Sequence, residues 1–314
     1  MKSEYPKVSI IIPVYNGANY LQYAIDSALR QTYENIEIIV VNDGSNDSGA
    51  TEQIALSYGD KITYYAKPNG GVSSALNYGI ERMNGEYFSW LSHDDLYMPE
   101  KVEKQMQDIM SHGVEDKLVA LCGTAFVDKN GAPVNKMWSM PQDGLYDSSA
   151  MLQYAYKNPF CGLAFLIPRN AFKVCGMFDE SLSYIQDIVM WKKLFLHGYK
   201  AIVDNEKLVS NRLHAAQQTA LHKERFRYEW EKTCESEIEA LCAEKEYTSL
   251  KLCALEAYKL GVPKVAKKAV EQLRKDDNAQ TAFLLKAEAY HAYGAVRPVL
   301  QKVYYAVKMR YKLS

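Results

Sequence analysis

Polar residues follow the apolar segments near the amino end of the chain, and their types suit the binding of a nucleotide. Tyr15 and Asn16 come directly after the apolar run 8–14, and Asp43 follows the next apolar run. A tyrosine ring packs well against a flat base, and a carboxylate accepts hydrogen bonds from a base or a ribose. The Asn-Asp-Gly-Ser segment at 42–45 is more often a turn that begins a helix, so this motif alone does not establish nucleotide binding.

Two adjacent acids, Asp94 and Asp95, follow another apolar segment in the sequence Ser-His-Asp-Asp. Hard cations such as Mg²⁺ and Mn²⁺ take carboxylate and phosphate oxygens together. These acids therefore predict a site at which a divalent metal binds a diphosphate. The alternative is a cap for a helix that begins at Pro99, and the intervening residues make this alternative weaker.

The apolar pattern predicts alternating strands and helices around these residues. The expected strands are 8–14, 36–41, 62–66, 87–91 and 118–122, and the expected helices are 19–30, 45–58, 73–83 and 99–110. This alternation predicts an α/β fold with a mostly parallel sheet flanked by helices. Ligands bind beyond the carboxyl ends of the strands in such sheets, so we expect the polar residues to converge there.

A change in composition marks a second part of the chain. From about residue 223 onward strand signals disappear, and Ala, Leu, Lys and Glu dominate. We expect a catalytic domain at 1–220 and a small all-α domain at 221–314, with a helix break at Gly261 and Pro263. Oligomerisation, acceptor binding and membrane association are the roles expected for the helical domain.

The end of the chain predicts a basic amphipathic helix. Basic residues between 297 and 312 alternate with apolar residues at helical spacing, and no acidic residue occurs after Glu288. Such a helix lies on an anionic membrane, or it docks its apolar face on the rest of the chain or on a second subunit. The sequence leaves these alternatives open.

Composition excludes several classes of protein. The formal net charge is −1, whereas nucleic-acid binding needs a surplus of clustered Lys and Arg. Six cysteines without a C-x-x-C pair argue against a zinc ribbon or a thioredoxin-type site, and they fit free thiols in a reducing cytoplasm. No apolar run reaches the roughly 18 residues of a membrane span, and no signal peptide is recognised. We therefore expect a cytoplasmic protein, with peripheral contact to the inner face of the membrane as an alternative.

Several motifs, in their order and spacing, resemble family 2 glycosyltransferases of the GT-A fold. The amino-terminal motifs are Pro13 to Asn16, Asn42 to Ser45, Asn69 to Ser73, Gly85 to Tyr87, and Asp94-Asp95 with Pro99. The later motifs are Gly176 to Glu180, Tyr184 to Asp187 with Trp191, and Arg212 to His214. The resemblance covers roughly residues 7–219 and implies a Rossmann-like domain that binds a nucleotide-sugar.

The resemblance implies a binding site for a UDP-sugar donor. Pro13, Tyr15 and Asp43 are expected to contact the nucleoside, with Asp43 at the uracil imide. Asp94 is expected to touch the ribose or the sugar. The remaining donor-binding positions implied by the family are Asn16, Ser73 and Arg212.

The resemblance also implies a metal ion and a general base. Asp95 and His214 are expected to hold a divalent metal, Mn²⁺ or Mg²⁺, that bridges the diphosphate. Asp187 falls where the family places the base that removes the acceptor proton. Taken alone, His214 is explained equally well as a surface histidine, and an aspartate before a helix is more often a cap.

The implied reaction is an inverting displacement that moves a hexose or N-acetylhexosamine from UDP to a hydroxyl of a glycan acceptor. A surface polysaccharide, a lipid-linked glycan and a glycoprotein remain open as acceptors. The family pattern is altered at Leu76, Ser92 and Gln186, which leaves the donor sugar and the acceptor least determined. A catalytically impaired binding module on the same fold is the alternative. A dinucleotide-dependent oxidoreductase is disfavoured because no G-x-G-x-x-G follows the first strand.

Overall fold

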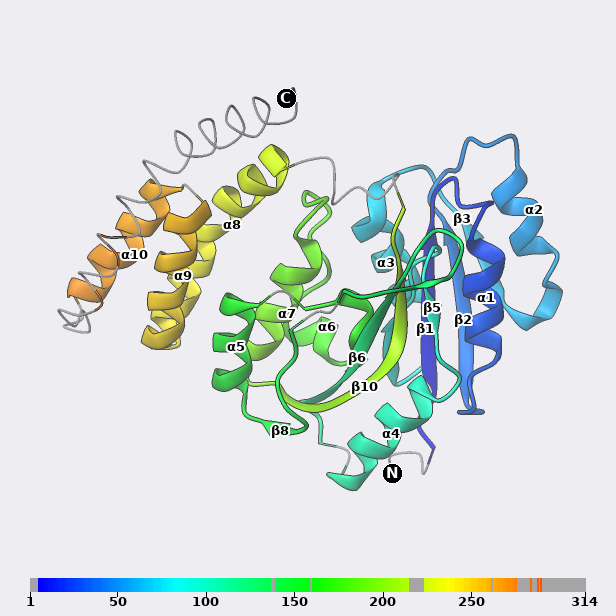
Figure 1. Ribbon diagram of the computed structural model, residues 1–314, viewed down its shortest axis with the longest axis horizontal. Helices are drawn as coiled ribbons and strands as arrows, with labels where there is room; N and C mark the ends of the chain where they lie inside the picture. Colours follow the sequence, from blue (N-terminus) through cyan, green and yellow to red (C-terminus); the bar gives the residue numbers. More distant parts are fainter. Residues whose placement is uncertain are drawn as a thin grey trace, which may run out of the picture. The chain divides into compact units, whose positions relative to one another are not determined.

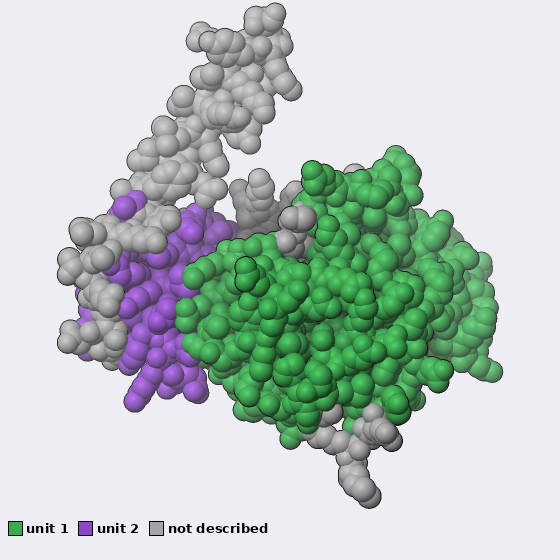
Figure 2. Space-filling view, turned by 60° about the horizontal axis from the view of Figure 1, so that its bottom comes forward, with its two compact units in different colours: residues 1–222 green, residues 223–314 purple. Residues whose placement is uncertain are grey.

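The computed structural model describes residues 5–113, 115–136, 139–158, 160–214, 223–260 and 262–275, together with positions 283, 287 and 289. The chain divides into two compact units, residues 1–222 and residues 223–314, which Figure 2 colours separately. The first unit contains every residue that the sequence predicts to bind a donor, bind a metal or act as a base.

Among the described residues, ten strands form one mixed sheet in the first unit (Figure 1). Hydrogen-bonded neighbours follow the order β3-β2-β1-β4-β9-β6-β10-β5, with β7 beside β6 and β8 beside β10. The strands are β1 (Val8–Val14), β2 (Ile36–Asn42), β3 (Thr63–Ala66), β4 (Tyr87–Trp90), β5 (Leu96–Tyr97), β6 (Leu118–Val127), β7 (Pro133–Val134), β8 (Gly144–Tyr146), β9 (Phe165–Pro168) and β10 (Lys200–Arg212). The first four strands of this order pair in parallel, and β9 runs antiparallel to both β4 and β6.

β1 lies in the middle of the parallel part because its side chains are buried on both faces of the sheet. All seven of its residues are buried, and it pairs with β2 along its whole length. Its pairing with β4 ends earlier, at Ile11 opposite Trp90. Pro13 is the next β1 residue on that side and has no N–H to donate, so the ladder does not continue. β1 and β4 therefore separate at their carboxyl ends.

Helices cover both faces of the parallel part, as the sequence predicts (Figure 1). The first unit contains α1 (Leu21–Leu29), α2 (Ala50–Leu56), α3 (Gly71–Arg82), α4 (Lys101–Ser111), α5 (Ser148–Lys157), α6 (Ala171–Val174) and α7 (Gln186–Leu196), with short 3₁₀ turns at Gly59–Lys61 and Gly162–Ala164. The crossovers through α1 and α2 lead outward from β1 to β3, whereas α3 leads back to β4. Because such crossovers are right-handed, α1 and α2 lie on one face and α3 lies on the other.

The helix predicted at 45–58 begins later than expected, at Ala50. Asn16 donates its backbone N–H to the Ser45 hydroxyl at 2.9 Å. The Asn16 side chain also exchanges two hydrogen bonds with Asn46, at 2.7 and 2.8 Å. These contacts hold the segment before Ala50 as a loop against the end of β1, which keeps it out of the helix.

The second unit is helical where it is described, with α8 (Lys223–Ala243), α9 (Tyr247–Leu260) and α10 (Pro263–Lys275). α10 begins at Pro263, as predicted, because a proline at the first position of a helix loses no hydrogen bond. The predicted cap at Gly261 and the basic helix at 297–312 lie outside the described residues. In the part of the chain that is described, no helix combines the length and the apolar character needed to cross a bilayer.

Candidate active site

The predicted site residues gather where the strand order reverses, between β1 and its neighbours β2 and β4. Tyr15 and Asn16 leave the end of β1, Asp43 leaves the end of β2, and Asp94 follows β4. Open α/β sheets bind ligands at such a switch point, beyond the carboxyl ends of the strands. Asn16 has a φ of +50°, which turns the chain sharply after β1, and Tyr15 stays 42% exposed beside it.

The Asp43 carboxylate is buried and accepts several hydrogen bonds. Lys67 lies with its Nζ atom 2.7 Å from Asp43 Oδ1. The backbone N–H of Gly70 donates to Oδ1 at 3.0 Å, and the N–H of Gly71 donates to Oδ2 at 2.7 Å. Asp43 therefore binds the turn that begins α3 as well as a lysine. A nucleobase that meets this carboxylate must share it with these donors.

Ser73 and Asn77 connect α3 to a loop that precedes α7. The Ser73 hydroxyl is buried and donates to the carbonyl of Leu182 at 3.3 Å. The Asn77 amide donates to the carbonyl of Phe178 at 2.9 Å and accepts its N–H at 3.0 Å. The structure thus gives Ser73 a packing contact, and it places the loop before Asp187 against the helix that Asp43 supports.

His214 lies beside Asp94, with its Nε2 atom 2.8 Å from Asp94 Oδ2. Tyr20 packs on the other side of the imidazole, with the two ring centroids 5.3 Å apart. Both side chains of the pair keep a small exposed fraction of 15%. A carboxylate oxygen and an imidazole nitrogen therefore meet at the edge of the switch point, on side chains that are partly exposed to solvent.

Asp95 faces away from this pair. It is buried and accepts the backbone N–H of Arg212 at 2.7 Å and the side-chain amide of Asn211 at 3.3 Å. Burial, and next the negative charge of Asp94, raise the pKa of Asp95 well above its usual range. The sequence grouped Asp95 with His214, whereas the structure pairs His214 with Asp94, because the turn directs the second acid to the end of β10.

Arg212 uses its guanidinium to hold backbone carbonyls. Its Nε atom donates to Asp94 O at 3.0 Å, and its Nη1 atom donates to Lys129 O at 3.2 Å. The guanidinium also lies 4.8 Å from the centre of the Tyr20 ring, and the residue is only 5% exposed. In this arrangement Arg212 fixes the turn that carries Asp94, and its predicted role in donor binding stays a prediction.

Asp187 lies in the first turn of α7, where its Oδ1 atom accepts the N–H of Ile188 at 2.8 Å. Its other oxygen faces Gly162 and Trp90. A methyl group built on Gly162 lies 3.1 Å from Asp187 Oδ2 and 2.9 Å from Trp90 Cζ3. Burial raises the pKa of Asp187 to about 6, partly offset by hydrogen bonds from backbone N–H groups. A carboxylate of this kind is mostly ionised near neutral pH and remains a stronger base than an exposed aspartate.

Comparison with known proteins decides the family. The sequence profile of "Glycosyl transferase family 2" matches residues 9–173, slightly more than half of the chain. The chain belongs to this family. The match contains β1 from its second residue onward, together with Asp43, Asp94 and Gly162, and ends before α7.

Several bacterial glycosyltransferases are similar to this family 2 glycosyltransferase. An uncharacterized glycosyltransferase of Rickettsia typhi is 50% identical over 217 residues, which cover 68% of this chain and 66% of the relative. TuaG of Bacillus subtilis, whose name places it in teichuronic acid biosynthesis, is 30% identical over 66% of this chain and 79% of TuaG. The chain matches less than two thirds of the length of the Rickettsia relatives, between 31% and 66%.

The solved structure of Staphylococcus aureus TarS residues 1–349 in complex with UDP-GlcNAc has the same fold. It superposes with a TM-score of 0.68 over 94% of this chain and 92% of that chain, at 19% identity. TarS is a GT-A glycosyltransferase, so the predicted GT-A fold, with its α/β sheet followed by a helical region, is confirmed.

Several residues of the site gave no clear signal in the sequence of this glycosyltransferase. Trp90 and Gly162 frame Asp187, but neither belongs to a motif that predicts a base. Cys161 donates its thiol hydrogen to Asn211 Oδ1 at 3.3 Å, and Asn211 in turn holds Asp95. Cys161 and Asn211 therefore form a chain of hydrogen bonds to Asp95. The sequence does not predict this chain, because its residues are far apart along the polypeptide.

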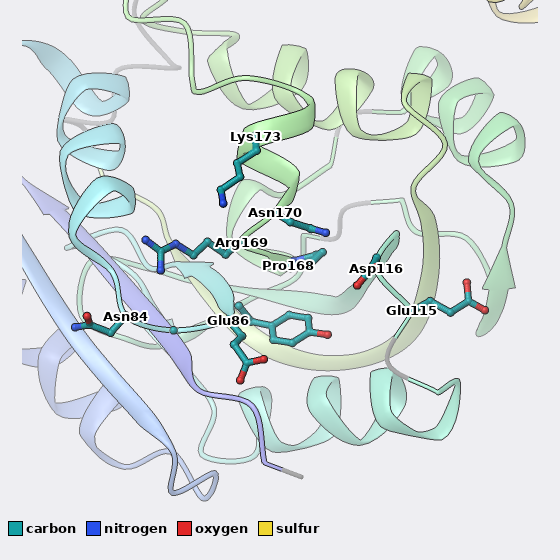
Figure 3. Close-up of a pocket in the computed structure, with 10 residues that line it drawn as sticks. Asn84, Glu86, Glu115, Asp116, Pro168, Arg169, Asn170 and Lys173 are labelled. Atoms are coloured by element: carbon teal, nitrogen blue, oxygen red, sulfur yellow. The ribbon is translucent and has the colours of Figure 1, made fainter. Parts of the chain in front are cut away.

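A separate cavity of about 410 Å³ lies at the amino end of β4, whereas the predicted site residues lie beyond the carboxyl ends of the strands (Figure 3). It is lined by residues at the amino end of β4, such as Glu86 and Tyr87, and by Arg169 and Lys173. None of the predicted site residues lines it. Acidic and basic side chains line it together, and neither the Asp94–His214 pair nor Asp187 is among its lining residues.

Proposed function

We propose that this family 2 glycosyltransferase transfers a hexose or N-acetylhexosamine from a UDP-sugar to a hydroxyl of a glycan acceptor, with inversion at the anomeric carbon. The observation that carries the proposal is Asp187, a partly buried carboxylate with its pKa raised to about 6 beside the switch point. The UDP-GlcNAc bound by TarS, a protein of the same fold, supports a UDP-sugar as donor. The acceptor class rests on the family and on the name of TuaG.

The nucleoside is proposed to lie against the ends of β1 and β2. Tyr15 is exposed there and offers its ring to the uracil, while Pro13 ends the ladder and leaves room beside it. Asp43 accepts the imide N–H, in competition with Lys67. Asn16 and Ser73 act indirectly, because the first holds the loop before α2 and the second holds the loop before α7.

Asp94 and His214 are proposed to hold a divalent metal. Their oxygen and nitrogen atoms form a donor set that suits Mn²⁺, and both atoms already point toward each other. His214 must then present a deprotonated Nε2, so the hydrogen bond to Asp94 opens on binding. Asp95 and Arg212 support the pair by fixing the turn after β4. When bound, a divalent cation neutralises the charge that develops on the departing diphosphate.

Asp187 is proposed to take the proton from the acceptor hydroxyl as its oxygen attacks the anomeric carbon. The bond from that carbon to the diphosphate oxygen breaks in the same step, so the product carries the opposite configuration and no enzyme-bound sugar forms. Trp90 and Gly162, which has no side chain, give Asp187 apolar neighbours. Burial among them raises the pKa of the carboxylate and makes it a stronger base.

We also propose that residues 1–220 carry the reaction and that the helical part, residues 221–314, serves the acceptor, a second copy of the chain or the membrane. The division of the chain at residue 222 supports a separate role for the helices.

The test is release of UDP from a panel of UDP-sugars, with and without Mn²⁺, in the presence of mixed saccharide acceptors. Wild type is compared with Asp187→Asn and with Asp60→Asn, an exposed control. The expected result is metal-dependent turnover of one donor, lost in Asp187→Asn and kept in the control. Equal turnover in Asp187→Asn refutes the assigned base, and UDP binding without turnover by the wild type favours a binding module.

A further inference from the structure

The helical unit contains a cluster of metal-ligating side chains that lies outside the transfer site. Cys234 and Glu237 belong to α8, and Cys253 belongs to α9. One ligand atom from each of the three lies within 4.8 Å of the other two. Among the described residues, this is the one group of three or more such side chains close enough to share an ion.

The cluster follows from the helical spacing. Positions three residues apart lie on the same face of a helix, so Cys234 and Glu237 point in the same direction from α8. α9 follows α8 after a short turn and packs against it, which brings Cys253 to that face. Both thiols are fully buried, whereas Glu237 is partly exposed. The two sulfur atoms are thus held inside the unit with a carboxylate toward solvent.

The separations fit a single cation. Three atoms within 4.8 Å of one another lie at most about 2.8 Å from a common centre, and zinc binds sulfur at about 2.3 Å and carboxylate oxygen at about 2.0–2.2 Å. Rotamer adjustments of at most about 0.8 Å therefore bring all three atoms to bonding distance. Two thiolates favour Zn²⁺ strongly over Mg²⁺ and Mn²⁺, which prefer oxygen ligands.

We propose that Cys234, Glu237 and Cys253 bind a Zn²⁺ ion that ties α8 to α9. Each thiol loses one proton to solvent when its sulfur bonds to the metal, the carboxylate supplies the third ligand, and a water molecule takes the fourth position on the side of Glu237. No group changes its oxidation state. The six cysteines lack a C-x-x-C pair, so the sequence pattern did not predict this site; its ligands come from two helices.

The proposed ion stabilises a small unit. A metal that joins two helices adds to the stability that a small domain gains from its apolar core. Because binding releases two protons, the affinity for zinc falls as the pH is lowered. The ion is structural, and donor binding in the first unit does not depend on it.

The test uses the full chain with the substitution Asp94→Asn. This substitution removes one of the two proposed metal ligands of the transfer site, so that added metal binds there less. The chelator-treated, reduced protein is titrated with Co²⁺, and the near-ultraviolet thiolate-to-cobalt charge-transfer band is recorded. We expect one equivalent of Co²⁺, displaced by Zn²⁺. The band is expected to disappear in Cys253→Ser and to remain in Cys242→Ser, whose cysteine lies on α8 outside the cluster.

A second measurement does not depend on the folding of a cysteine variant. Alkylation of each cysteine by iodoacetamide is followed by mass spectrometry in the Asp94→Asn protein, with and without zinc. Zinc is expected to slow alkylation of Cys234 and Cys253 at least about 10-fold and to leave Cys242 unchanged. Absence of the charge-transfer band, a band that persists in Cys253→Ser, or equal alkylation with and without zinc overturns the proposal. The outcome is independent of whether UDP-sugar transfer is observed.

Discussion

His214 Nε2 lies 2.8 Å from Asp94 Oδ2, although the two residues are 120 positions apart in the chain. This contact supports our proposal that Asp94 and His214 hold the metal, whereas the sequence predicts Asp95 and His214; in the proposal Asp95 has a supporting role. We predict that His214→Ala and Asp94→Asn each lower Mn²⁺-dependent turnover on the order of 10²-fold. Each variant would bind the metal more weakly, and the metal would then no longer neutralise the negative charge that develops on the departing UDP. Mn²⁺ titration of UDP binding, read by calorimetry, is expected to show weaker binding in both variants.

Asp95→Ala is predicted to act through stability instead. Its removal leaves the buried N–H of Arg212 without its acceptor, which costs about 1–3 kcal/mol. Denaturant unfolding is expected to show this loss, with Asp94→Ala as the matched control of nearly unchanged stability. If Asp95→Ala unfolds like the control and abolishes Mn²⁺ binding, Asp95 is the metal ligand and the assignment to Asp94 is wrong.

The pH dependence of turnover reports the state of Asp187. Burial raises its pKa to about 6, and only the ionised form accepts a proton from the acceptor. We predict that kcat falls with decreasing pH on an acid limb near pH 6 and is nearly flat above about pH 7. The measurement is a kcat profile with saturating donor and Mn²⁺. An acid limb near pH 4 contradicts the assigned environment.

The same shift predicts a gain in stability for Asp187→Asn. The pKa of Asp187 is raised in the folded protein, from 3.8 to about 6, so the fold holds this proton more tightly than the unfolded chain. Stability therefore falls as the pH rises from about 4 to about 6, and the charged residue remains unfavourable at pH 7. Asparagine carries no charge, so we expect Asp187→Asn to raise the free energy of unfolding on the order of 1–2 kcal/mol at pH 7, after allowance for partial exposure. Denaturant unfolding at pH 4 and pH 7 is expected to show the gain only at pH 7.

The sequence predicted the parallel strands well because buried strands are nearly continuous apolar runs. β1 has the predicted bounds, and β2, β3 and β4 differ by one residue at an end. The helix at 45–58 was predicted too long, because the Asn16–Asn46 contact that replaces its first turn joins distant residues. The sequence also could not predict the orientations of Asp94 and Asp95. They depend on contacts with residues at and after the end of β10, which are distant in the chain.

Gly162→Ala tests the surroundings of the proposed base without changing a polar group. A methyl group there meets Asp187 Oδ2 and Trp90, so one of them must move. We predict a fall in kcat of roughly 10-fold or more with UDP affinity unchanged, because small misplacements of a reacting group are costly. The control is Ala164→Gly, which changes the 3₁₀ turn that contains Gly162 without adding an atom. Normal kcat in Gly162→Ala contradicts the proposed contact.

Lys67 and Asp43 together offer a donor and an acceptor at one end of the nucleotide site. Uracil presents an imide N–H between two carbonyl oxygens, so it can take the place of Lys67 on Asp43 Oδ1 while the lysine moves to a carbonyl. Cytosine has an acceptor at the position of this N–H and loses the contact with the carboxylate. We predict that Lys67→Met weakens UDP binding about 10-fold, through one lost charged hydrogen bond, and weakens CDP binding less. Lys61→Met, at an exposed position nearby in the chain, is the control, and Lys67→Arg is expected to restore most of the affinity. An equal loss for UDP and CDP means instead that Lys67 only supports the fold around Asp43.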